Sequence, residues 1–178
     1  MTDAPLDQAL DAALALAAER PWREVSLREV AERAGVDFAT LYAEAPSKPL
    51  LVLALSKRLD HAALATAATT SDDAHDRLFD ATMARIEAME PHRASLLSMA
   101  AGEGRVAIAT HLPLTARAIL EAAGVPATAP RLAAMTLVWG RVVQVWRDDE
   151  GALNRTMAEI DQRLKQMRER LGRIRAGF

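Results

Sequence analysis

The stretch "SLREVAERAGVDFATLYAEAPSKPLL", residues 26–51, decides the fold of this chain. Its first four residues form a capping box, in which Ser26 accepts a hydrogen bond from the Glu29 backbone and the Glu29 side chain reaches back. Gly35 follows an amphipathic segment and tolerates the left-handed backbone that ends many helices. Asp37 then supplies the short acceptor side chain that begins a new helix. We therefore predict two short helices joined by a tight turn.

The residues before this stretch add another helix. Apolar residues recur at helical spacing from Leu6 to about Glu19, and Pro21 ends that segment. We expect Trp22 and Val25 to cover the core beneath the break. The three helices together have a helix-turn-helix layout, with the second and third joined by a glycine-containing turn.

The rest of the chain is also predicted to be helical, and the fold class is all-α. No period-2 run appears, and apolar content dominated by Ala, Leu, Val and Met favours helices. Breaks are expected at the polar stretch "TAATTSDDAHD" (residues 66–76), at Pro91 and at "VPATAP" (residues 125–130), and the last helix is expected to start near Gly151. A fourth helix begins at Ser47 and runs past residue 64. Its candidates for burial are Leu50, Leu51, Leu53, Ala54, Leu59 and Leu64.

The composition bounds the class of protein. The chain has 178 residues, of which 51% are hydrophobic and 26% charged, so it can bury a sizeable core. It has no cysteine, no signal-peptide pattern and no apolar stretch long enough to span a bilayer, so we expect a soluble, cytoplasmic protein.

Catalysis is not expected. The four histidines, His61, His75, His92 and His111, have no metal-ligand spacing. The sequence has no cysteine nucleophile, no G-x-S-x-G motif and no glycine-rich phosphate loop. The acids of "RDDE" (residues 147–150) are interpreted as a helix cap and a solvated turn. We therefore predict that the protein is not an enzyme and has no cofactor and no metal site.

The stretch that decides the fold resembles the N-terminal domain of the TetR family of regulators. The resemblance rests on Val30-Ala31, Ala34-Gly35-Val36, Thr40-Leu41-Tyr42, Ser47-Lys48 and Leu50-Leu51. It implies a TetR-like fold, with a DNA-binding head over residues 1–50. Residues 51–178 would form a helical bundle that binds a small ligand and makes a homodimer.

The resemblance also implies which residues meet DNA. Thr40 and Tyr42 would touch phosphates or base edges, and Lys48 would donate to a phosphate beside the start of the fourth helix. Arg28 could lie on the same face. Four positions depart from the family pattern. The family commonly has Ser where this chain has Asp37, His or Tyr where it has Ala43, and an aromatic pair where it has Glu44 and Ala45.

The charge of the predicted head opposes DNA binding. Residues 1–60 contain seven basic and ten acidic side chains, a difference of 7 − 10 = −3. Because neutralised phosphates supply most of the non-specific affinity for DNA, an acidic head weakens this interpretation.

A ligand site is suggested by "RLAAMTLVWGRVVQVW", residues 131–146, which is apolar nearly all round and should be central to its domain or to a dimer. Five of its side chains could line a cavity for a small apolar ligand or lipid: Met135, Trp139, Val142, Val143 and Trp146. The alternative, favoured by the usual role of apolar stripes, is that they form the core.

The last segment carries an apolar seam on a basic helix. Its members, spaced four or three residues apart, are Ile160, Leu164, Met167, Leu171, Ile174 and Phe178. From residue 162 onward there are six basic side chains and one acidic one, 6 − 1 = +5. Residues 160–178 could lie on an anionic membrane surface, or the seam could pack against its own bundle or a partner.

A second, more diffuse resemblance covers about 100 residues of the C-terminal half. "HDRLFDATMARIEAMEPHRASL" and "AMTLVWGRVVQVWRDDEGALNRTMAEIDQRL" are similar to the ubiquinone-biosynthesis accessory proteins with a TetR-like fold. Two hypotheses follow. The first is a TetR-like transcriptional regulator that binds double-stranded DNA, acts as a repressor and responds to a small apolar ligand. The alternative is a lipid-binding accessory protein with a vestigial head and a terminal helix that meets a membrane or partner.

Overall fold

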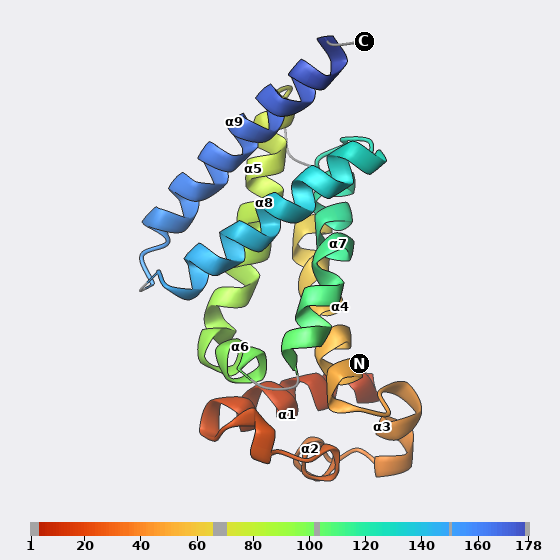
Figure 1. Ribbon diagram of the computed structural model, residues 1–178. Helices are drawn as coiled ribbons and strands as arrows, with labels where there is room; N and C mark the ends of the chain where they lie inside the picture. The colour runs from red at the N-terminus through yellow and green to blue at the C-terminus, as the bar shows by residue number, and fades with distance from the viewer. Residues whose placement is uncertain (1–3, 66–70, 102–103, 150, 177–178) are drawn as a thin grey trace. The chain divides into compact units, whose positions relative to one another are not determined.

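The computed structural model describes residues 4–65, 71–101, 104–149 and 151–176. Every regular element in these ranges is helical, so the predicted all-α class is confirmed (Figure 1). The elements are α1 (Pro5–Glu19), η1 (Trp22–Glu24), α2 (Leu27–Ala34), α3 (Phe38–Glu44), α4 (Lys48–Ala65), α5 (Ala74–Met89), η3 (Glu90–His92), α6 (Arg93–Ala100), α7 (Gly104–Ala122), α8 (Ala129–Arg147) and α9 (Asn154–Ala176).

The chain divides into two compact units, each built from two segments. The first unit combines Met1–Arg58 with Pro91–His111, and the second combines Leu59–Glu90 with Leu112–Phe178.

In the first unit α1 packs against α2, α3 and α6. The hydroxyl of Ser95 donates a hydrogen bond of 2.7 Å to the carbonyl oxygen of Leu14, and the hydroxyl of Ser98 accepts one of 3.0 Å from the backbone N–H of Trp22. These bonds attach α6 to the head, although 81 and 76 residues separate the partners. Trp22 and Val25 are buried, as expected from the break after Pro21.

The burial predicted along α4 is right for Leu51 and Leu59 and wrong for Leu50 and Leu64. Leu50 is 44% exposed and Leu64 is 43% exposed. The physical reason is the helical period: the main buried row of α4 recurs every four positions, with Val52 and Asp60 beside it, and Leu50 and Leu64 lie on the side of the helix away from that row. Leu53 and Ala54 are half-buried. The buried row consists of Leu51, Leu55, Leu59 and Ala63.

In the second unit α9 packs against α8 and α5 (Figure 1). The predicted seam is buried at Ile160, Leu164 and Met167 and half-buried at Leu171, so in its described part it packs on its own unit. The side chains of Ile174 and Phe178 lie outside the described residues.

The last helix begins three residues later than predicted. Gly151 adopts a left-handed backbone (φ 86°), and α9 starts at Asn154. Asp149 fixes this start, because one of its carboxylate oxygens accepts hydrogen bonds of 2.8 Å from both the backbone N–H and the hydroxyl of Thr156. The acid cluster of residues 147–150 therefore includes a buried capping group.

A buried ion pair lies inside the second unit. Asp60 on α4 accepts hydrogen bonds from Arg85 Nε on α5, at 2.8 Å, and from the Thr115 hydroxyl on α7, at 2.9 Å. The Arg85 guanidinium also lies 5.6 Å from the centre of the Trp139 ring on α8. Burial lowers the pKa of Arg85, and the charge of Asp60 and its hydrogen bond oppose that shift. The pair thus connects four helices of this unit.

Candidate nucleic-acid interface

The start of α2 is set by the predicted capping box. The Ser26 hydroxyl accepts a hydrogen bond of 3.2 Å from the Glu29 backbone, and the Glu29 carboxylate accepts one of 2.8 Å from the Ser26 backbone. Glu29 also receives a hydrogen bond of 2.7 Å from Arg20 at the end of α1. The bond from Arg20, followed by those from the backbone and hydroxyl of Ser26, lowers the pKa of Glu29 from 4.5 to about 2. Glu29 therefore holds α2 to α1 as an ionised group.

The turn between α2 and α3 is formed by Gly35 and Asp37. Gly35 has φ 66° and ψ 27°, the left-handed conformation that glycine adopts without steric cost. A Cβ at Gly35 would meet nothing within 4 Å, so the requirement for glycine comes from the backbone conformation. One carboxylate oxygen of Asp37 accepts hydrogen bonds from the backbone N–H of Thr40, at 3.0 Å, and from its hydroxyl, at 3.3 Å. Asp37 is thus the N-terminal cap of α3, as predicted.

The helix α3 has one buried anchor and an exposed face. Leu41 is buried, whereas Thr40 is exposed and Tyr42 is 52% exposed. The Tyr42 ring lies 5.9 Å from the Phe38 ring, and the Arg28 guanidinium of α2 lies 4.6 Å from the centre of the Phe38 ring. Arg28, Phe38 and Tyr42 therefore form a connected row across the two helices.

Phe38 was not predicted as part of this site. It follows the Asp37 cap directly and stands four residues before Tyr42, a spacing that places both rings on one side of a helix. That spacing is the signal in the sequence that could have identified it.

Lys48 lies at the start of α4, but its ammonium group points toward η1. Its Nζ donates to the carbonyl oxygen of Trp22 at 2.8 Å and to that of Arg23 at 3.4 Å, and it lies 5.1 Å from the centre of the Trp22 ring. An ammonium group has three N–H donors. Lys48 therefore joins α4 to η1, and its role as a phosphate ligand stays a prediction.

Among the described residues up to Arg58, four basic side chains form ion pairs. Arg20 pairs with Glu29, Arg33 with Glu19, Arg58 with Asp11, and Arg23 with Glu24. The other cations of residues 1–60 are Arg28, Lys48 and Lys57. Glu44 is exposed at the end of α3, and Ala45 next to it is buried in the core. The predicted DNA-facing residues thus include two cations, Arg28 and Lys48.

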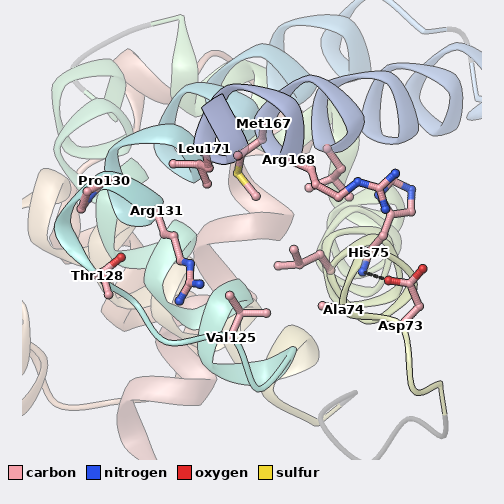
Figure 2. A pocket seen from close by; sticks show the side chains of 13 residues that line it. Asp73, Ala74, His75, Val125, Thr128, Pro130, Arg131, Met167, Arg168 and Leu171 are labelled. Atoms are coloured by element: carbon pink, nitrogen blue, oxygen red, sulfur yellow. Dashed lines mark hydrogen bonds between the residues drawn. The ribbon is translucent and has the colours of Figure 1, made fainter. Parts of the chain in front are cut away.

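The five residues predicted to bind a ligand lie in the second unit, on α8. Four are buried and Val143 is half-buried. The Trp146 indole N–H donates a hydrogen bond of 2.7 Å to the Glu90 carboxylate. A cavity of about 530 Å³ in the same unit is lined by α5, the segment before α8, the first turn of α8, and α9 (Figure 2). None of the five residues lines this cavity, and their role toward a ligand stays a prediction.

Two further findings concern metals and membranes. Among the described residues, no group of three or more His, Cys, Asp or Glu side chains is arranged to hold a metal ion. No helix in the described part of the chain has the length and apolar character needed to cross a membrane.

These observations define an all-helical protein with a helix-turn-helix head, whose third helix has an exposed face of Thr40 and Tyr42. Residues 9–55 match the family model described as "Bacterial regulatory proteins, tetR family". The resemblance to the TetR family is therefore confirmed: the chain carries the N-terminal domain of this family on a TetR-like fold.

Solved structures support the same fold over nearly the whole chain. A TetR transcriptional regulator from Rhodococcus sp. RHA1 is 21% identical over 92% of this chain and 94% of that chain, with a TM-score of 0.71. The TetR transcriptional regulator from Nitrosomonas europaea ATCC 19718 is 21% identical over 93% of this chain and 98% of that chain, with a TM-score of 0.72. A TetR-like transcriptional regulator from Rhodococcus sp. RHA1 is 19% identical over 91% of this chain and 94% of that chain, with a TM-score of 0.54. No protein with a curated description matches this chain significantly.

Proposed function

We propose that this protein is a DNA-binding transcriptional regulator, a cytoplasmic repressor that acts as a homodimer and responds to a small ligand. The observation that carries the proposal is the exposed face of α3. Leu41 anchors the helix, while Thr40 and Tyr42 face away from the core directly after the Gly35 turn. A short helix held in this way fits the major groove of DNA and presents side chains to base edges.

The charges of the head predict how strongly its affinity for DNA depends on the salt concentration. Because four basic side chains of the head pair with acids inside the unit, few phosphates would be neutralised per head. The slope of log affinity against log salt should therefore be shallow, about −2 to −4 for a dimer with one or two phosphate contacts per head. Hydrogen bonds and ring contacts from Thr40 and Tyr42 would carry much of the specific affinity.

A homodimer is supported by the surface of α8 and α9. Leu137 on α8 is 72% exposed. It lines a groove of about 320 Å³ between the two helices, together with Ala133, Ala134 and Met167. A two-fold dimer pairs the same patch on both subunits and would present two heads to two half-sites on DNA.

The experiment that tests the proposal is selection from a random duplex library, followed by affinity measurements on the enriched sequence across salt concentrations. Tyr42→Ala and Arg28→Ala should each weaken binding about tenfold or more, the usual loss for one base-edge or phosphate contact. Lys57→Ala is the matched control for Arg28→Ala, because it removes one exposed positive charge elsewhere in the first unit. No enrichment at low salt would contradict the proposal.

The second candidate is a TetR-fold accessory protein that binds lipid and does not bind DNA. The acidic, internally paired head favours this alternative. The burial of Ile160, Leu164 and Met167 within the second unit opposes membrane contact through the seam of α9. Anionic liposomes distinguish the candidates: binding that is lost on deletion of residues 162–178, without any binding to duplex DNA, would support the accessory protein.

A further inference from the structure

The cavity of about 530 Å³ in the second unit has an apolar lining and a polar margin (Figure 2). Its volume is in the range of pockets that bind small organic molecules. The apolar side chains come from α5, the segment before α8, and α9. They are Leu78, Val125, Pro130, Leu164, Met167 and Leu171.

The acids near the cavity already have partners. Asp73 caps α5, because its carboxylate accepts a hydrogen bond of 2.9 Å from the backbone of His75. The His75 ring in turn lies 3.0 Å from the carboxylate of Asp161, which also accepts a hydrogen bond of 2.6 Å from Lys165. The bonds from Lys165 and then His75 lower the pKa of Asp161, so this carboxylate is ionised and balanced by its neighbours.

The two arginines of the cavity differ from these acids. Within the part of the chain that the structure describes, neither Arg131 nor Arg168 forms an ion pair with a carboxylate. Arg131 makes a long hydrogen bond of 3.4 Å to the carbonyl oxygen of Pro126. Figure 2 shows Arg131 extending from α8 on one side of the cavity and Arg168 from α9 on the side of His75. Two guanidinium groups therefore lie beside an apolar surface.

We propose that this cavity binds a single-chain organic anion, whose carboxylate pairs with one guanidinium group of the margin, that of Arg131 or that of Arg168, and whose apolar chain lies against Leu78, Leu164 and Met167. A guanidinium group suits a carboxylate because its parallel N–H donors match the two oxygens. This organic anion would be the small ligand of the regulator proposed above. Any effect of the anion on regulation therefore rests on that proposed function. The binding itself requires no DNA.

The test is calorimetric titration of the full chain with dodecanoate. Dodecanoate should bind, dodecanol should bind at least about tenfold more weakly because it lacks the charge, and butanoate should not bind measurably because it lacks the chain. Vesicles of phosphatidylglycerol form a further arm, since an acidic lipid surface offers related chemistry.

Substitutions locate the site. Of Arg131→Gln and Arg168→Gln, the variant that removes the pairing guanidinium group should weaken dodecanoate binding about tenfold. Arg170→Gln is the matched control, because Arg170 is exposed on the same helix but does not line the cavity. Gly172→Leu is an independent test: Gly172 lines the cavity, and a Cβ there would meet nothing within 4 Å, so the larger side chain should fill the space and abolish binding while the melting temperature is kept.

Several results would overturn the proposal. These are no dodecanoate binding, equal binding of dodecanol, or dodecanoate binding unaffected by the two arginine variants and Gly172→Leu. Vesicle binding that depends on Arg131 and Arg168, with no binding of free dodecanoate, would also overturn it in favour of a lipid surface. Dodecanoate binding without DNA binding would keep the site and contradict the proposed function. DNA binding without dodecanoate binding would support the proposed function and contradict the proposed ligand site.

Discussion

The ammonium nitrogen of Lys48 lies 2.8 Å from the carbonyl oxygen of Trp22, which ties the start of α4 to η1. The residue that is predicted to donate to a phosphate therefore also has a structural role. The two roles must be separated experimentally, because a variant that loosens the head would also lose DNA affinity without any direct contact.

Lys48→Ala should lower the free energy of unfolding by about 1 kcal/mol, the usual net contribution of one hydrogen bond. Urea unfolding measures this loss. Lys57→Ala, which removes an exposed ammonium group on the same helix, should change stability by less than about 0.5 kcal/mol. Equal effects of the two variants would show that the bond to Trp22 contributes nothing.

The capping box predicts a dependence of stability on pH. The folded pKa of Glu29 is about 2, below its usual 4.5. Its contribution is therefore present above pH 4.5 and is lost as the pH falls from about 4.5 to about 2. Urea unfolding of the wild type and of Glu29→Gln should differ most above pH 5 and converge near pH 2. A constant difference across this range would contradict the assigned pKa.

The buried ion pair predicts a large loss of stability. Asp60→Asn removes the charge of Asp60 from its buried pair with Arg85, and breaking such a pair costs about 3–5 kcal/mol. Asp11→Asn breaks the exposed pair with Arg58 and should cost about 0–1 kcal/mol. Denaturant unfolding of both variants makes the comparison, and a small loss for Asp60→Asn would show that Arg85 is compensated in another way.

Substitution by alanine should change the stability of the protein in opposite directions at two glycines. Gly35 has φ 66°, where a Cβ costs about 1–2 kcal/mol, so Gly35→Ala should destabilise the protein. Gly172 lies within α9 with ordinary helical backbone, so Gly172→Ala should stabilise it by up to about 1 kcal/mol. Melting temperatures measured by circular dichroism give both signs, and a stabilising Gly35→Ala would exclude the left-handed turn.

The parts of the fold that were predicted correctly depend on neighbours in the sequence. The capping hydrogen bonds of Ser26, Glu29 and Asp37 each span three residues, and Gly35 acts through its own backbone conformation, so their spacing is sufficient to place the turn and both helix ends. Leu50 shows the limit of this reasoning, because an apolar residue beside a buried row need not belong to it.

The parts that were missed depend on distant segments. The bonds of Ser95 and Ser98 that attach α6 to the head join residues far apart in the chain, and no local pattern indicates them. The same holds for the direction of Lys48, which follows from where η1 lies. The cavity is lined by residues of α5, the segment before α8, α8 and α9, which no local pattern in the sequence groups together.

The ion pairs of the first unit determine how its affinity for a polyanion such as DNA can change. Arg20 and Glu19 at the end of α1 each pair with a residue of α2, and Asp11 pairs with Arg58 on α4. Neutralising one of these acids, as in Glu19→Gln, would release an arginine and raise the net charge of the head by one at little cost in stability. The strength of attraction to a polyanion is therefore adjustable from α1, without any change to α3, the helix that would read the sequence.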